Sequence, residues 1–146
     1  MSANSVNPGP TFAATVLRAF VAWLLILGLA IVNGVLREAV LVAALGAAPG
    51  LALSGVILMA CVLGVALLLV ARLGPVSKRT LLAIGIFWLA LTLGFEFGFG
   101  RAVAHKSWAQ LLDAYALRDG NLWPLVLLVV VVAPLFADWL QRRGQR

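Results

Sequence analysis

Four long apolar segments alternate with short polar segments along the chain. They lie at about residues 17–36, 51–71, 81–100 and 122–140. A helix needs roughly 20 apolar residues to cross the hydrocarbon core of a bilayer, and each segment has about that length. The pattern predicts an all-α, polytopic membrane protein whose four transmembrane helices form a small bundle, a single domain over residues 1–146. A cleaved signal peptide in place of the first span is the main alternative.

A shorter apolar segment, residues 39–48, lies between the first and second spans and cannot cross a bilayer by itself. Pro49 and Gly50 separate it from the second span. The segment either extends the first helix, lies at the membrane interface or re-enters the bilayer. Re-entrant backbone must be shielded by protein, so the sequence favours one of the first two arrangements.

One amphipathic segment, at about residues 107–118, separates the third and fourth spans. Its large apolar residues recur at the spacing of one helical face: Trp108, Leu111, Leu112 and Tyr115. Ser107 and Gln110 have the spacing of a capping box, which starts a helix. Because Trp and Tyr suit the head-group layer, the segment predicts a short helix that lies in the membrane interface.

Composition agrees with lipid as the solvent. The chain is 64% hydrophobic and 11% charged, with a mean hydropathy of +1.10, whereas soluble domains average about 45–50% apolar and about 25% charged residues. The net charge is +6. The basic residues lie between and beyond the apolar segments, where they orient the helices and contact anionic lipids. Membrane lipids are therefore the expected partners, and nucleic-acid binding is not indicated.

The distribution of basic residues predicts the orientation of the four spans. Seven would lie on the side of the termini: Arg18, Arg72, Lys78, Arg79, Arg142, Arg143 and Arg146. Four would lie on the opposite side: Arg37, Arg101, Lys106 and Arg118. Since the cytoplasmic side carries the excess of Lys and Arg, both termini are expected in the cytoplasm. Few lysines, much alanine and short loops favour a bacterial inner membrane.

A polar cluster is expected at the outer membrane boundary, around a carboxylate inside the third span. Its members are Asn33, Arg37, Glu38, Glu96, Arg101 and His105. Ionisable groups within the membrane usually face protein and find a partner, and the candidates for Glu96 are Arg37 and Arg101. The cluster is either an ion pair that fixes how the first and third helices pack, or a site that binds a polar head group or relays a proton.

Small residues and aromatic residues suggest two further roles. Ala90, Gly94 and Gly98 recur every four residues and would let another helix approach closely. That helix could belong to this bundle or to a second chain, or the small residues could form a thin wall beside a lipid-sized groove. Four aromatic residues are expected to anchor the helices at the membrane interface: Trp108, Tyr115, Trp123 and Trp139.

The residues needed for catalysis or metal binding are sparse. His105 is the only histidine and Cys61 the only cysteine, so neither a metal centre nor haem is indicated. The serines have no second histidine to build a triad with, and no phosphate-binding glycine motif occurs. The sequence therefore indicates no cofactor and gives little support for an enzyme.

The stretch FEFGFGRAVAHKSWAQLLDAYALRDGNLWPLVLL, with NGVLRE upstream, resembles a family of small, uncharacterised four-span inner-membrane proteins of proteobacteria. The matching positions are Asn33, Arg37, Glu38, Glu96, Gly98, Arg101, Trp108 and Trp123. The resemblance implies a fold and a location and carries no activity.

The leading hypothesis is a non-enzymatic membrane protein that acts by lateral helix association, as a homo-oligomer or as an accessory subunit of a membrane complex. The second is a small transporter or lipid-binding carrier with a polar site around Glu96 and Arg37. A weaker third is an enzyme on a lipid substrate, with Glu96 or His105 as general base. The second hypothesis requires that Asn33, Arg37 and Glu96 line one cavity, because a carrier must enclose its ligand.

Overall fold

The computed structural model describes residues 9–144, and this part of the chain is all-α, without strands. Seven helical elements occur in it: α1 (Phe12–Leu36), a π-helical turn (Arg37–Leu41), α2 (Val42–Leu45), α3 (Ala47–Leu73), α4 (Lys78–Ala102), α5 (Trp108–Asp113) and α6 (Trp123–Gly144). Four helices are long and apolar enough to cross a membrane: Phe12–Leu45, α3, α4 and α6. The predicted class, four spanning helices and one shorter helix, is confirmed.

The first helix is longer than is needed to cross the hydrocarbon core of a bilayer. It continues without a break through the π-helical turn and α2 to Leu45, where Gly46, at φ +88°, ends it. Its 34 residues span about 51 Å, well beyond the ~30 Å hydrocarbon core. Residues 39–45 therefore extend the first helix, and α3 begins at Ala47.

The core lies where α1, α3, α4 and α6 converge. Trp88 of α4 is fully buried there, and its Nε1 donates a hydrogen bond of 2.8 Å to the Ala19 carbonyl of α1. Gly85, one turn earlier, lies against the backbone of Val131 in α6. The two helices can cross this closely only because position 85 has no side chain.

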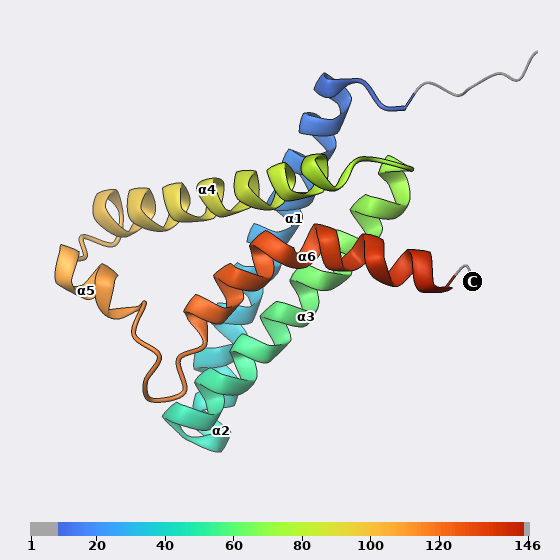
Figure 1. Cartoon of the computed structure of the whole chain (residues 1–146). Coiled ribbons are helices and arrows are strands. Elements are labelled where there is room, and N and C mark those ends of the chain that lie inside the picture. The colour runs from blue at the N-terminus through green and yellow to red at the C-terminus, as the bar shows by residue number, and fades with distance from the viewer. Residues whose placement is uncertain (1–8, 145–146) are drawn as a thin grey trace, which may run out of the picture.

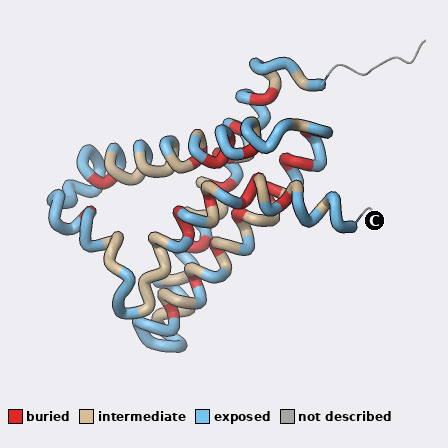
Figure 2. Tube along the Cα trace, viewed as in Figure 1, coloured by how far each residue is buried: buried red, intermediate tan, exposed pale blue. Residues whose placement is uncertain are grey.

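One helix, α4, crosses the other spans near its start and separates from them towards its end. Figure 1 shows α4 diverging from α1, α3 and α6 towards α5, which with the following loop connects the end of α4 to the start of α6. Figure 2 shows buried residues concentrated where the helices converge, whereas α5 and much of the diverging part of α4 are exposed or half-buried. The divergence gives the bundle room for a cavity between α4 and the other spans.

Candidate functional site

A cavity of about 460 Å³ opens between α1, α3, α4 and α6 on the side where α4 diverges. Its apolar lining includes Trp23, Ile26, Leu58, Val62, Val126 and Val130. Its polar lining includes Asn33, Arg37, Ser54, Glu96, Lys106 and Asn121. The polar residues of α1 and α4 lie towards the C-terminal ends of these helices, and Ser54 lies in the first third of α3. Apolar residues line the cavity throughout, including Phe95 and Leu122 beside the polar groups. The cavity is therefore mostly apolar, with its polar groups gathered towards one end.

Glu96 is the carboxylate in this cavity, and two aromatic donors bind it. The Tyr115 hydroxyl donates a hydrogen bond of 2.6 Å to Glu96 Oε2, and Trp123 Nε1 donates one of 3.1 Å to the same oxygen. Both aromatic residues are half-buried. Trp123 begins α6 and Glu96 lies near the end of α4, and the segment that contains α5 joins these two helix ends. This connection is the signal in the sequence that could have indicated the contact.

The expected pairing of Glu96 with Arg37 or Arg101 does not occur in the described structure. Arg37 Nε pairs with the neighbouring Glu38 at 2.9 Å. Arg101 donates a hydrogen bond of 2.7 Å to the Lys106 carbonyl and lies over the Trp108 ring, 5.1 Å from its centroid. Five residues of α-helix rotate by about 140° beyond a full turn, so Arg101 points away from the face that Glu96 occupies.

The Tyr115 hydroxyl is suited to remain a donor to Glu96. Burial raises the pKa of Tyr115 well above its ordinary value, and the adjacent Glu96 carboxylate raises the pKa further through the hydrogen bond and its charge. The Tyr115 ring also stacks on Phe97 of α4, with centroids 6.0 Å apart. Both contacts hold the segment after α5 against α4.

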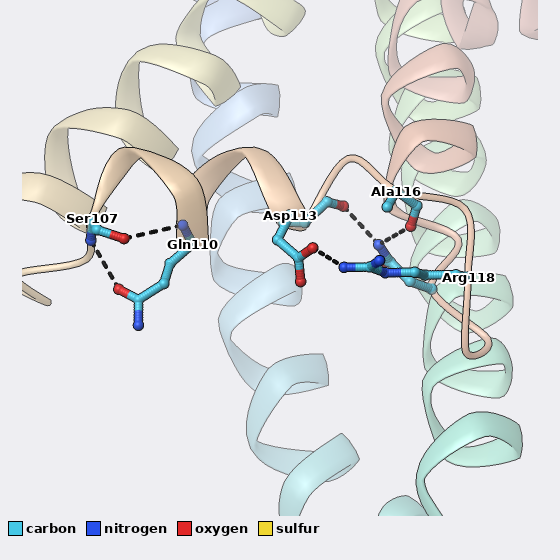
Figure 3. A network of polar contacts seen from close by, with 7 residues as sticks. Ser107, Gln110, Asp113, Ala116 and Arg118 are labelled. Carbon is cyan, nitrogen blue, oxygen red and sulfur yellow. Dashed lines mark hydrogen bonds and ion pairs between the residues drawn. The ribbon is translucent and has the colours of Figure 1, made fainter.

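The α5 region borders the cavity and contributes Gln110 and Leu111 to its lining. The predicted capping box is present, with Ser107 and Gln110 each bonding the other's backbone (Figure 3). Leu111 is buried against Gly100 at the end of α4. The helix ends at Asp113, earlier than the expected boundary near residue 118.

The early end of α5 has a local cause. Asp113 forms an ion pair with Arg118, and Asn121 Nδ2 donates to the carbonyls of Ala114 and Ala116 at 2.6 and 2.9 Å (Figure 3). These bonds satisfy backbone acceptors in turns, which competes with continuation of the helix. The turns also bring Tyr115 to Glu96.

Asn33 is a second polar group of the cavity, and it is almost fully buried, with 6% of its surface exposed. Its Nδ2 donates to the Ser54 carbonyl at 3.1 Å and to the Ser54 hydroxyl oxygen at 2.9 Å. Its Oδ1 is buried and has no hydrogen-bond partner. Asn33 therefore joins α1 to α3 and leaves one acceptor unused.

The remaining predicted residues lie elsewhere. Ala90, Gly94 and Gly98 are exposed, and a Cβ added at either glycine would meet no atom within 4 Å. These residues therefore do not pack against another helix of this chain. His105 is exposed in the loop after α4 and does not line the cavity.

Two aromatic residues expected at the interface, Trp108 and Trp139, are exposed. The Arg143 guanidinium lies 3.9 Å from the centroid of the Trp139 ring. Within residues 9–144, no three His, Cys, Asp or Glu side chains gather in a way that could hold a metal ion. The polar groups of the cavity can bind a ligand through hydrogen bonds and ionic contacts.

The fold and the cavity define a multi-pass membrane protein with an amphipathic cavity beside one of its spans. A comparison with known proteins finds no match to this chain among family models, curated proteins or solved structures. The function must therefore be inferred from the site itself.

Proposed function

We propose that this protein binds a single amphiphilic molecule of the bilayer in the cavity between α1, α3, α4 and α6, as a small lipid carrier or transporter. The observation that carries the proposal is that Asn33, Arg37 and Glu96 line the same cavity. An ion pair that only fixed helix packing would instead join Glu96 to Arg37 or Arg101 directly. The Tyr115 and Trp123 bonds hold the Glu96 carboxylate at the cavity wall.

The size and lining of the cavity support this function. Sites for small molecules measure ~300–1,000 Å³ and are mostly apolar with a few placed polar groups. The cavity, at about 460 Å³, lies in this range and has apolar residues at its deep end. Ionisable residues inside membrane proteins often mark ligand or ion pathways.

The proposed setting is a bacterial inner membrane, with both termini in the cytoplasm and the cavity at the outer leaflet. The excess of basic residues on the side of the termini supports this orientation. The start of α1, the α3–α4 connection and the end of α6 lie at the upper and right side of the molecule in Figure 1, away from α2 and α5. The resemblance to small four-span proteobacterial proteins supports the location.

Photolabelling would test the binding function. The probe is a 16-carbon alkyl phosphate with a diazirine in mid-chain, added to the full chain in detergent micelles. We expect adducts on cavity residues of α1 and α3, and Ala30→Phe, which fills the cavity, should reduce them by about tenfold. The matched control is Ala60→Phe, since Ala60 of α3 is exposed and does not line the cavity. Adducts spread evenly over all lipid-facing surfaces, and unchanged by Ala30→Phe, would contradict the proposal.

Lateral association is a second candidate function, because Ala90, Gly94 and Gly98 are exposed on one face of α4. Small residues on a lipid-facing helix allow close contact with another helix. If this face binds a second chain, Gly94→Leu should reduce the dimer fraction in native mass spectrometry by several-fold, and Gly64→Leu on α3 should not. A strictly monomeric wild-type protein without a co-purifying partner would count against association.

A further inference from the structure

The polar groups of the cavity follow a definite order from its deep end to its mouth. Asn33 and Arg37 both line the cavity from the first helix. They are four residues apart, so Asn33 lies about 6 Å deeper along the helix axis. Glu96 lies within α4, whereas Lys106 lies beyond the end of that helix. Along each of these two segments the hydrogen-bond acceptor therefore lies deeper in the bundle than the cation.

The deep acceptor, Asn33 Oδ1, is unused in the protein. The Ser54 carbonyl can only accept, so the amide nitrogen of Asn33 must face it, and the amide oxygen is left over. This oxygen is buried without a partner, although nearly all buried polar atoms in proteins are hydrogen-bonded. A ligand that donates a hydrogen bond at this depth would satisfy it.

The groups nearer the mouth are also available to a ligand. Both protein donors to Glu96 reach Oε2, so Oε1 has no donor among the described residues. The ion pair of Arg37 with Glu38 uses Nε alone, and so the two terminal nitrogens of the guanidinium can bind an anion. Arg37, whose charge is paired with Glu38, and Lys106 are the two cations that line the cavity.

We propose, as an extension of the binding function above, that the ligand is a single-chain amphiphile with a hydrogen-bond donor next to the chain and an anion beyond it. The chain occupies the apolar end, the donor binds Asn33 Oδ1 and the anion binds Arg37. The volume of about 460 Å³ is about that of one long acyl chain, so the anion would lie at the open end of the cavity. Two sources share this chemistry: a lysophospholipid, through its glycerol hydroxyl and phosphate, and an N-acyl amino acid, through its amide and carboxylate.

Displacement of the photoprobe by four unlabelled competitors on the wild-type protein separates these groups. Palmitoyl lysophosphatidate and N-palmitoylglycine carry chain, donor and anion. Hexadecyl phosphate lacks the donor, and monopalmitoylglycerol lacks the anion. We expect lysophosphatidate or N-palmitoylglycine, or both, to displace the probe at roughly five- to tenfold lower concentration than hexadecyl phosphate or monopalmitoylglycerol. This factor corresponds to the free energy of one additional hydrogen bond or one additional ionic contact. Whichever of the first two is stronger identifies the source.

Two variants test whether Asn33 and Arg37 cause the preference for competitors that carry both a donor and an anion. Asn33→Leu should remove the advantage of lysophosphatidate over hexadecyl phosphate, and Arg37→Gln should remove its advantage over monopalmitoylglycerol. Arg79→Gln is the control, because Arg79 is exposed at the start of α4 and does not line the cavity. The competitor series on the unaltered protein keeps the inference testable if Asn33→Leu does not fold.

The outcomes distinguish the head-group inference from the binding function. If the probe labels the cavity and all four competitors displace it equally, the head-group inference is overturned and the binding function stands. If the probe does not label the cavity, both are rejected. Lysophosphatidate and N-palmitoylglycine could keep their full advantage over the other two competitors in both Asn33→Leu and Arg37→Gln. That result would overturn the assignment of the preference to these two residues.

Discussion

Replacing Gly85 with alanine is expected to cost about 3 kcal/mol of stability, at the upper end of the usual range for overpacking. A Cβ at position 85 would overlap the Val131 carbonyl oxygen and would lie 2.8 Å from the Val131 carbonyl carbon. These are backbone atoms of α6, so no change of side-chain rotamer can relieve the overlap, and α4 must move away from α6. Equilibrium unfolding of the detergent-solubilised protein in increasing SDS would measure the loss.

The matched control for this change lies on the same helix. Gly94→Ala introduces the same methyl group where no atom lies within 4 Å, so its stability should stay within about 0.5 kcal/mol of wild type or rise slightly, because alanine favours helix. Equal unfolding curves for the two variants would show that the close crossing at Gly85 does not hold the bundle together.

Glu96→Ala is expected to release the α5 segment from the bundle, at a cost of about 3 kcal/mol, since hydrogen bonds to charged groups contribute about 1.5–3 kcal/mol each. The change leaves the Tyr115 hydroxyl and the Trp123 indole N–H without their acceptor. Amide hydrogen exchange should therefore rise by tenfold or more in residues 107–121, while the buried part of α3 keeps its protection.

Two variants control for the Glu96 result. Glu38→Ala removes a carboxylate that is 67% exposed and pairs only with Arg37, so exchange in residues 107–121 should not change. Tyr115→Phe keeps the ring stacked on Phe97 and removes only the hydroxyl, so it should give an intermediate increase. If Glu96→Ala does not change amide exchange in residues 107–121, then Leu111 and the stacking of Tyr115 on Phe97 hold this segment without the carboxylate.

The sequence alone determined the elements that depend on local pattern. Four apolar segments of membrane-crossing length became four helices, because helix formation in lipid satisfies every backbone group within the segment itself. The start of α5 was likewise predictable, since the capping box joins Ser107 and Gln110, which are three residues apart.

Only the tertiary structure decided which groups meet. Glu96 binds Tyr115 and Trp123 instead of an arginine, and Gly85, instead of Gly94 or Gly98, lies at the helix crossing. Both outcomes depend on how far each helix is rotated about its axis and where α4 diverges from α6. The physical reason is that a hydrophobic run specifies depth in the membrane and carries little information on rotation, because lipid and neighbouring helices offer apolar residues nearly the same environment.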